Sequence, residues 1–355
     1  MKIAYLGDSS VASTSRHRAD ALVRLGHSVR LLDPYAHLGA QVTNRFFQAL
    51  HYRTGYHALQ PIISRWIRDI GTVLGNSEIV WINGGELFGP AILRLIRQRG
   101  LPVVLYNNDD ATGYRDGARF DMVRHSIHLY DLCASRSERE FEYRRLGARD
   151  FMGVWMGYDE VAHQPYCDPL QISDAFRSDV AFVGTCIPGE ARDEFIVALK
   201  NMGLDVAIWG NGWQRARMWK QLRDLWRGAA ISGRSYVAAI QGSKLALGLV
   251  SKGNRDQHTR RTFEIPYAGG LLCAERTAQH LTVFAEGTEA LFWSDVEECA
   301  RVCREIIRDE ARRLMIREQG RRKVLALGVG NEDVCAAILA RLRAERTAAV
   351  PSDPA

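Results

Sequence analysis

The stretch NRDQHTRRTFEIPYAGGLLCAE, residues 254–275, decides how this chain is expected to fold and what it is expected to bind. A basic, polar turn that includes Arg260 and Arg261 comes directly before a carboxylate, Glu264. A helix that begins here would direct backbone N–H groups and the positive end of its dipole toward an anion. The arginines would add charge-assisted contacts to phosphate oxygens. Because Glu264 could accept hydrogen bonds from ribose hydroxyls, the stretch suits a nucleotide diphosphate that carries a sugar.

The residues that follow the carboxylate predict a tight connection into a buried strand. Ala268, Gly269 and Gly270 are small, and residues 271–273 are apolar. Glycine lets the backbone approach a neighbour closely, so Gly269 is a candidate contact to a ligand.

Strand and helix patterns alternate on both sides of this stretch, as a parallel sheet requires. In the first half, residues 2–7, 28–32, 78–83, 101–106 and 130–134 are expected to form strands, and helices are expected over 15–25, 89–98 and 137–146. A linker is expected over 155–179. In the second half the expected strands are 179–184, 205–209, 245–250 and 270–274, and the expected helices are 193–202, 235–241, 296–308 and 309–327. The pattern predicts two α/β domains.

The stretch and its surroundings also resemble a known family. The run Arg261–Pro266, then Gly269-Gly270 and Glu275-Arg276, is similar to the donor-site signature of group 1 glycosyltransferases of the spore-maturation type. Residues 243–247 resemble a strand of that family, and residues 284–289 resemble its F-x-E-G-x-E segment; the resemblance is firm over about residues 178–326. It implies the GT-B fold, in which two Rossmann-like, doubly wound parallel-sheet domains face each other across a cleft. It also implies transfer of a sugar from a nucleotide-sugar donor. We expect this transfer to need no metal or other cofactor.

Under this interpretation residues 1–160 form an acceptor domain, 161–343 form a donor domain and 344–355 form a flexible tail. The resemblance implies that Glu264 contacts the ribose. The spacing Asp256-x7-Glu264 matches the E-x7-E pattern of retaining relatives with Asp in the first position, which favours a catalytic role for Asp256 and retention of configuration; a turn-forming Asp is the alternative. The remaining donor-binding candidates are Arg260 and Arg261 for the diphosphate, Gly184 and Thr185 after an expected strand, Arg192, Gly210 and Gly269. For Arg192 the alternative is an ion pair with Glu190 or Asp193.

Polar turns that follow expected strands in the first half supply the acceptor-side candidates. Ligands of open α/β sheets bind beyond the carboxyl ends of the strands, and Asp8, Glu86, Asp109 and Asp110 follow three such strands. Asp109 is the candidate catalytic base; capping of a turn is the alternative for the Asp pair. The first turn lacks G-x-G-x-x-G, which counts against nicotinamide binding.

Composition narrows the class of protein. The chain has 355 residues, 46% of them hydrophobic and 25% charged, with a net charge of +6, which is ordinary for a globular protein. No apolar run approaches the roughly 18 residues that a spanning helix needs. Seven cysteines without paired metal spacing indicate reduced thiols and a cytoplasmic protein. Two stretches, 46–66 and 213–226, interleave aromatic and basic residues, which suits peripheral contact with the inner face of an anionic membrane, a lipid-linked acceptor or nucleic acid; core aromatics with solvated arginines are the alternative.

Three functions therefore stay open. The first is a metal-independent glycosyltransferase that uses a nucleotide-sugar and a carbohydrate, lipid-linked or protein acceptor. The second is a nucleotide- or glycan-binding protein of the same fold without turnover. The third is a basic nucleic-acid-binding module, which nothing in residues 254–275 requires, so nucleic acid is not expected as a partner.

Overall fold

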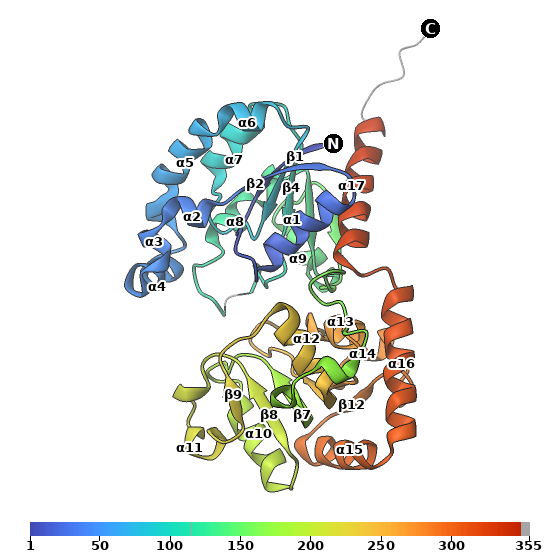
Figure 1. The fold of residues 1–355 in the computed structure, drawn as a ribbon. Helices are drawn as coiled ribbons and strands as arrows, with labels where there is room; N and C mark the ends of the chain where they lie inside the picture. Colours follow the sequence, from blue (N-terminus) through green and yellow to red (C-terminus); the bar gives the residue numbers. More distant parts are fainter. Residues whose placement is uncertain (114, 349–355) are drawn as a thin grey trace. The chain divides into compact units, whose positions relative to one another are not determined.

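The computed structural model describes residues 1–113 and 115–348, which divide into two compact units (Figure 1). Unit 1 comprises Met1–Trp155 and the segment that begins at Asn331, and unit 2 comprises Met156–Gly330. Each unit contains a six-stranded sheet, and all paired strands in both sheets are parallel.

The sheet of unit 1 has the order β2-β1-β3-β4-β5-β6. Its strands are β1 (Lys2–Leu6), β2 (Ser28–Leu32), β3 (Ile79–Asn83), β4 (Val103–Tyr106), β5 (Leu132–Ser135) and β6 (Phe151–Gly153). Its helices are α1 (Thr14–Arg24), α2 (Pro34–Leu38), α3 (Ala40–Thr43), α4 (Arg45–Arg53), α5 (Gln60–Asp69), α6 (Gly71–Gly75), α7 (Pro90–Arg97), α8 (Asp121–Ser126), α9 (Glu140–Arg145) and α17 (Asn331–Ala348), with short 3₁₀ turns η1 (His57–Leu59), η2 (Ile127–Leu129) and η3 (Ser137–Arg139).

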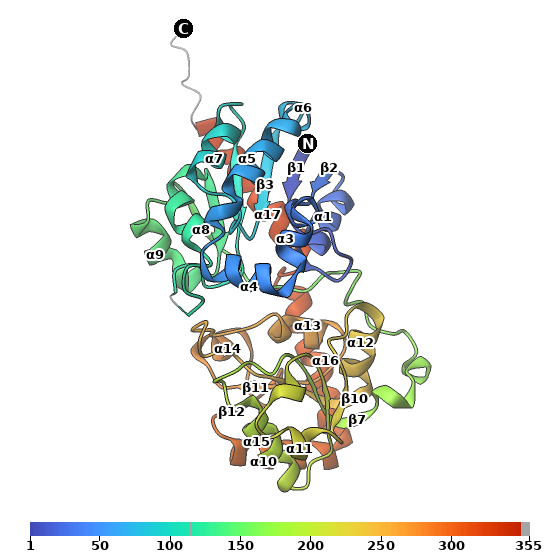
Figure 2. The same ribbon diagram turned by 90° about the vertical axis from the view of Figure 1, so that its left-hand side faces the viewer.

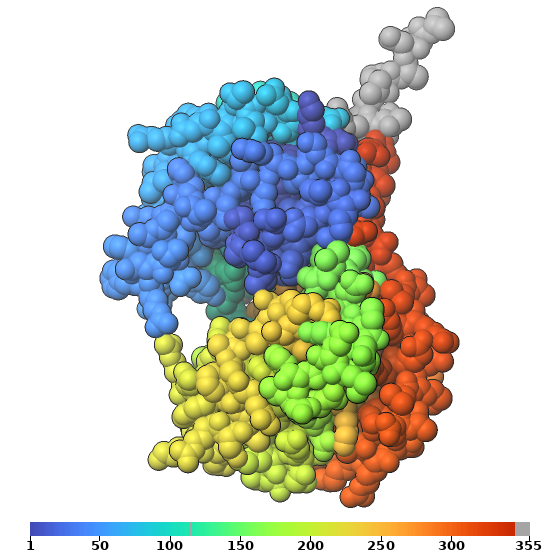
Figure 3. All heavy atoms as spheres, viewed as in Figure 1, coloured from blue at the N-terminus to red at the C-terminus, as the bar shows by residue number. Residues whose placement is uncertain are grey.

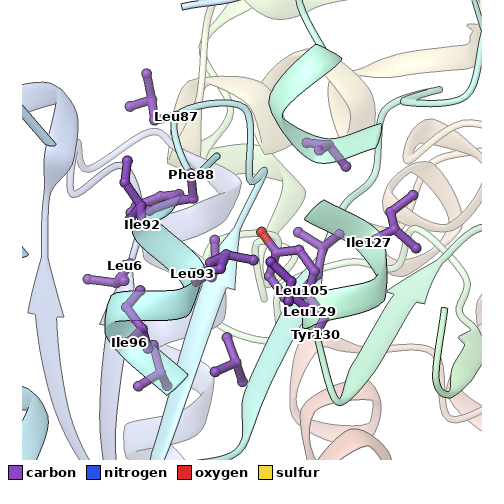
Figure 4. Close-up of a cluster of buried hydrophobic side chains, with 14 of the residues drawn as sticks. Leu6, Leu87, Phe88, Ile92, Leu93, Ile96, Leu105, Ile127, Leu129 and Tyr130 are labelled. Carbon is purple, nitrogen blue, oxygen red and sulfur yellow. The ribbon is translucent and has the colours of Figure 1, made fainter. Parts of the chain in front are cut away.

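Alternate residues of these strands enter two separate cores. Leu6, Ile82 and Leu105 face α5, α7 and α8. Figure 4 shows Leu93 of α7 toward Leu105 and Tyr130, with Ile92 and Ile96 of the same helix nearer Leu6. Tyr5, Trp81 and Tyr106 point to the opposite face, where α1 and α17 cover them. Strands buried on both faces read as continuous apolar runs, which is why the sequence predicts them well.

The C-terminal helix α17 belongs to unit 1, although the chain reaches it through unit 2. Val334, Cys335, Ile338, Leu339 and Leu342 pack in the same core as α1 and β1, and Figure 1 shows α17 beside α1. The expected domains place residues 331–343 with the second domain and the boundary at 160/161, whereas the compact units meet at 155/156 and 330/331. The apolar side chains of α17 complete the core on this face of the unit 1 sheet. Of the tail expected at 344–355, residues 349–355 lie outside the described residues.

The sheet of unit 2 has the order β12-β11-β10-β7-β8-β9. Its strands are β7 (Ser178–Val183), β8 (Val206–Trp209), β9 (Trp226–Gly228), β10 (Ser243–Gly248), β11 (Leu272–Glu275) and β12 (Leu291–Trp293). Its helices are α10 (Arg192–Asn201), α11 (Trp219–Leu222), α12 (Gly233–Gly242), α13 (Arg261–Tyr267), α14 (Ala278–Val283), α15 (Val296–Arg308) and α16 (Glu310–Ala326), with 3₁₀ turns η4 (Pro169–Gln171), η5 (Asp174–Phe176) and η6 (Trp213–Arg215). The expected linker 155–179 therefore largely belongs to unit 2.

The order of strands in unit 2 identifies where a ligand is expected. Counted along the chain from β7, the order is 6-5-4-1-2-3, which is the dinucleotide-binding order read from the other edge. After β7 the chain adds β8 and β9 on one side of it, and β10 then pairs with β7 on the other side. Helices α10 and α15 pack in the core on one face of this sheet, whereas α12 and α13 contact β7, β10 and β11; Figure 2 shows these helices of unit 2 from a second side. The switch point between β7 and β10 is the place where such sheets bind ligands.

Candidate functional site

Four of the expected donor-binding residues meet at the carboxyl end of β7. Gly184 and Thr185 follow the strand directly. Arg192 donates from Nη1 to the carbonyl oxygen of Thr185 over 3.0 Å, and Arg261 donates from Nε to the carbonyl oxygen of Val183. Two arginines that are 69 positions apart in the sequence therefore converge on one three-residue segment at the switch point.

Gly184 and Gly210 are explained first by the packing of two neighbouring loops. Gly210 has a φ of 154°, and a Cβ atom there would lie 2.0 Å from the carbonyl oxygen of Gly184. The same oxygen accepts a hydrogen bond of 2.8 Å from the indole of Trp213, which is fully buried. Gly210 thus lets the β8 loop touch the β7 loop, and Trp213 holds this contact in place.

Arg192 is both buried and paired. Only 9% of it is exposed, and its Nη2 lies 2.7 Å from Oε2 of Glu190, which is one of the two pairings considered from the sequence. Ser251, after β10, donates to the other oxygen of Glu190. Burial lowers the pKa of Arg192, Glu190 opposes this change, and nearby Arg261 adds to it. The pair therefore joins the β7 loop to the β10 loop across the switch point.

Glu264 lies in a buried polar cluster that residues distant in the sequence complete. Its Oε2 accepts a 2.8 Å hydrogen bond from the hydroxyl of Tyr236 on α12. Its Oε1 lies 3.7 Å from His163 Nε2 and 4.0 Å from Arg260 Nε. Burial alone would raise the pKa of Glu264, but His163, Arg260, Arg261 and the Tyr236 hydroxyl together hold that pKa below its usual value. The side chain is therefore a carboxylate at neutral pH.

The start of α13 differs from the open helix end expected from the sequence. The N–H groups of Thr262 and Phe263 donate to the carbonyl oxygens of Thr259 and Arg260, each over 3.0 Å, and the N–H of Glu264 donates to Arg260 over 2.8 Å. The N–H of Thr259 donates to the hydroxyl of Thr262. Tight turns satisfy helix ends in this way, so the chain itself uses several of the N–H groups that were expected to hold an anion.

Asp256 and Gly269 lie at opposite ends of the segment that contains α13. Asp256 precedes the helix and is 8% exposed, and its N–H donates to the carbonyl oxygen of Ser251. Gly269, with a φ of 78°, follows the C-cap residue Ala268, where a left-handed glycine commonly ends a helix. Asp256 therefore lies in the loop between β10 and Arg260, whereas Gly269 serves the helix end away from it and does not join the candidate site.

A cavity of about 450 Å³ opens beside the β7 and β10 loops. Its wall includes the N-terminal half of α10, the start of α15 and the carboxyl ends of β10, β11 and β12. The ion pair between Lys252 and Glu275 borders it, and the carboxylate of Glu275 also accepts from the N–H of Val250. Arg192 Nε and Trp293 Nε1, on two residues of this wall, have no hydrogen-bond partner among the described residues. Both nitrogen atoms are buried, so two residues of the wall each hold an unused donor beneath its surface.

The segment that resembles F-x-E-G-x-E has a structural explanation. Arg276, which follows β11, donates to Glu286 over 2.6 Å and to Glu298 over 2.9 and 3.0 Å. Glu289 accepts from the N–H of Ala285. Hydrogen bonds from Arg276 hold the pKa of Glu298 at about 2. These carboxylates fix the loops after β11 and β12.

In unit 1, two expected acceptor-side residues meet at an arginine that the sequence analysis did not identify. Arg119 Nη2 lies 3.4 Å from Glu86 and 3.1 Å from Asp109, and its guanidinium lies 4.5 Å from the ring centroid of Phe120. Glu86, which is 7% exposed, also accepts a 3.0 Å hydrogen bond from Tyr35. Burial would lower the pKa of Arg119, but Glu86 and Asp109 raise it overall. The carboxyl ends of β3 and β4 thus carry a cluster of two carboxylates around one arginine.

The other two acceptor-side candidates shape turns. Asp110 accepts from the N–H of Gly113 over 2.9 Å and lies 3.4 Å from Arg139 Nε. Asp8 accepts from the N–H of Ser10 over 2.8 Å. The contact of Asp110 with Gly113 corresponds to the capping role that was considered as the alternative for the pair Asp109 and Asp110.

Three of the seven cysteines come together in the core of unit 2. The sulfur atoms of Cys273, Cys299 and Cys303 all lie within 4.8 Å of one another, and all three residues are fully buried. Leucine side chains of β10 and β12 belong to the same core. Three thiolates around a divalent ion would leave net negative charge in apolar surroundings, which is costly. Neutral thiols packed as small apolar side chains fit this place better.

The sequence analysis named Glu264, Arg192 and Arg261 as candidates but did not name the residues that contact them. Tyr236, His163 and Arg119 have no motif around them, and their roles depend on chain segments that fold together. His163 lies in the expected linker, where no strand, helix or motif pattern in the sequence marks it as a site residue.

Comparisons with known proteins agree with this architecture. Residues 192–328 match the family model described as glycosyl transferase-like. A sucrose-phosphate synthase from Thermosynechococcus elongatus superposes with a TM-score of 0.72 at 15% identity, over 99% of this chain and 100% of that one. HepE from Anabaena, solved with UDP and glucose, has a TM-score of 0.67 at 13% identity, over 97% and 100%. An α,α-trehalose 6-phosphate synthase from Burkholderia multivorans has a TM-score of 0.63 at 12% identity, over 100% and 98%.

The search of curated proteins finds no match. The comparisons do not separate the spore-maturation type from other glycosyltransferases, so that subtype stays a prediction. The two parallel six-stranded sheets, their flanking helices and the full-length superpositions give the conclusion: this chain has the GT-B glycosyltransferase fold, with a glycosyl transferase-like sequence over residues 192–328.

Proposed function

We propose that the protein is a glycosyltransferase that takes a sugar from a nucleotide-diphosphate-sugar bound to unit 2. One observation carries the proposal: Arg192 and Arg261 converge on Gly184 and its neighbours at the switch point of a dinucleotide-type sheet. This is the place at which sheets of this order bind nucleotides. The related folds support it, since HepE was solved with UDP-glucose.

The chemistry follows from the charges at this place. When the bond between the anomeric carbon and the diphosphate breaks, the acceptor oxygen bonds to that carbon and negative charge develops on the departing diphosphate. Fixed cations stabilise such charge without reorganising, by on the order of 3 kcal/mol for each well-placed donor. Arg260 and Arg261 are the residues proposed for this role, and the carboxylate of Glu264 is proposed to accept from the ribose hydroxyls.

Several finer parts of the proposal rest on the sequence pattern. Asp256 is proposed to act near the reacting carbon with retention of configuration, and the reaction is proposed to need no metal. Asp109, with Glu86 and Arg119, is proposed to bind or deprotonate the acceptor, which would be a carbohydrate, a lipid-linked sugar or a protein. The protein is proposed to act in the cytoplasm.

A second function is favoured by a specific observation. Arg192 is already paired with Glu190, and the N–H groups of Thr262 and Phe263 are already bonded. A nucleotide- or glycan-binding protein without turnover would tolerate the pairing of these groups within the chain, because it does not have to stabilise a leaving group.

Donor binding and donor hydrolysis separate the two functions. In a thermal-shift screen of nucleotide-sugars that includes UDP-glucose, a ligand at 100 times its Kd stabilises the folded protein by about 2.7 kcal/mol. A transferase then hydrolyses the bound donor slowly, whereas a binding protein leaves it intact. If no nucleotide-sugar shifts the melting temperature, the proposed transferase and the nucleotide-binding form of the alternative both fail.

A further inference from the structure

Residues 34–68 form a surface region of unit 1 with an unusual charge distribution. The region contains α2, α3, α4 and α5 except for its last residue, and it has four arginines and three histidines; its nearest acidic residues in the sequence are Asp33 and Asp69, which flank it. Arg45, Arg53, Arg65 and Arg68 are exposed. No ion pair involves any of the four among residues 1–113 and 115–348, although ion pairs are frequent elsewhere in unit 1. The four arginines outnumber the two flanking carboxylates, so the region presents net positive charge.

Helix α4 adds exposed apolar side chains to this charge. Phe46 is 73% exposed, Phe47 40% and Leu50 45%. Arg45 and Arg53 stand at the first and last positions of the helix. Figures 1 and 3 show α4 at the left-hand margin of unit 1. An aromatic and aliphatic face between arginines is the pattern of helices that lie in a membrane interface.

The other stretch that interleaves aromatic and basic residues, 213–226, has aromatic side chains that are largely packed in the fold, unlike those of α4. Trp213 is fully buried, and Trp219 and Trp226 pack edge to face against each other and against the core of unit 2. Those aromatics are explained by folding. Phe46 and Phe47 contact each other with ring centroids 5.7 Å apart and remain exposed.

We propose that α4 and the basic surface around it dock the protein onto an anionic lipid bilayer, with Phe46, Phe47 and Leu50 entering the headgroup region. Nine residues give a helix of roughly 14 Å, too short to span a bilayer but long enough to lie along it. The arginines contact lipid phosphates while the three apolar side chains leave water. Nucleic acid explains the surface less well, because bases stack on phenylalanine but offer nothing to Leu50.

The proposal is tested with the full chain and phospholipid vesicles, and it requires no turnover. We expect cosedimentation with vesicles that contain about 30% phosphatidylglycerol and little with pure phosphatidylcholine, since the surface potential supplies much of the attraction. Binding falls about ten-fold or more in the double variant Phe46→Ser, Phe47→Ser because the apolar contribution is lost. Vesicle binding falls similarly in the double variant Arg45→Gln, Arg53→Gln. The binding that this variant retains depends less on salt concentration.

A matched control uses exposed apolar residues of unit 2. Leu314 and Met315 on α16 are 48% and 53% exposed, and Leu314→Ser, Met315→Ser is expected to bind vesicles like the unaltered chain. Equal melting temperatures exclude unfolding as the cause of any loss. The proposal is overturned if the unaltered chain does not bind anionic vesicles, or if the Phe46→Ser, Phe47→Ser variant binds them as strongly as the unaltered chain. It is also overturned if this surface binds single-stranded nucleic acid and no vesicles. Because no donor is present, failure of the proposed glycosyl transfer leaves these outcomes unaffected.

Discussion

Replacing Glu264 by glutamine is the sharpest test of the donor site. The substitution keeps the shape of the side chain and removes its charge. Oε2 is occupied by the Tyr236 hydroxyl, whereas Oε1 is 3.7 Å from His163 and 4.0 Å from Arg260, too far for hydrogen bonds. Oε1 therefore retains acceptor capacity for ribose. A hydrogen bond to a charged acceptor exceeds a neutral one by about 1 to 1.5 kcal/mol. For two ribose hydroxyls, donor affinity is expected to fall roughly 25- to 150-fold.

The assay is calorimetric titration with the nucleotide-sugar that gives the largest thermal shift. Tyr236→Phe leaves the charge in place and removes one hydrogen bond to Glu264, so its loss of affinity is expected to be smaller. Glu297, exposed on α15, supplies the control, and Glu297→Gln is expected to change nothing. Full donor affinity in a folded Glu264→Gln variant would refute the assignment of this carboxylate, and an equal loss in the Glu297 variant would show that the effect is not specific to the site.

Three further predictions concern stability and cofactors. Gly210→Ala is expected to destabilise unit 2 by about 2 kcal/mol or more in urea unfolding, because the added Cβ would lie 2.0 Å from a backbone oxygen. The matched control is Gly228→Ala, since Gly228 has a similar φ of 156° and no atom within 4 Å of an added Cβ. Equal losses of stability in the two variants would contradict the steric explanation. Burial lowers the pKa of His280, so the folded state takes up its proton less readily than the unfolded state. Stability is expected to fall as pH drops below about 6.5, and a chain with His280→Gln should lose less between pH 7 and pH 5.5; an identical loss would assign the pH dependence to other groups. Turnover of the donor is expected to survive excess EDTA, and a loss that added Mg²⁺ restores would end the proposal of a metal-independent reaction.

The sequence was most informative where burial leaves a continuous pattern. Strands such as β3 and β4 are buried on both faces, so their apolar runs stand out between polar turns. The short strands β6, β9 and β12 have three residues each, too few for a period to appear. The region 34–75 folds into five short helices whose boundaries are set by local caps such as Asp33 and Asn44 rather than by a long amphipathic repeat.

The candidate site was predictable only for residues that lie close together in the sequence. Arg261 and Glu264 share one helix and one motif. Tyr236, which bonds to Glu264, is 28 positions away, and Arg119 is 33 positions from Glu86. A single sequence carries no sign of such pairs, because each depends on how the loops after different strands pack. Helix α17 shows the same limit, since its apolar stripe would cover either sheet.

The position of α17 has a consequence for how the protein is made. The ribosome delivers residues 1–155 first, yet one face of their sheet is covered only in part, by α1, until residues 331–342 emerge after the whole of unit 2. At a synthesis rate of about 5 to 20 residues per second, this exposure lasts for roughly ten seconds or more. Unit 2, which is one continuous segment, has no such delay. The nascent N-terminal half is therefore the part of this chain for which a chaperone would matter most.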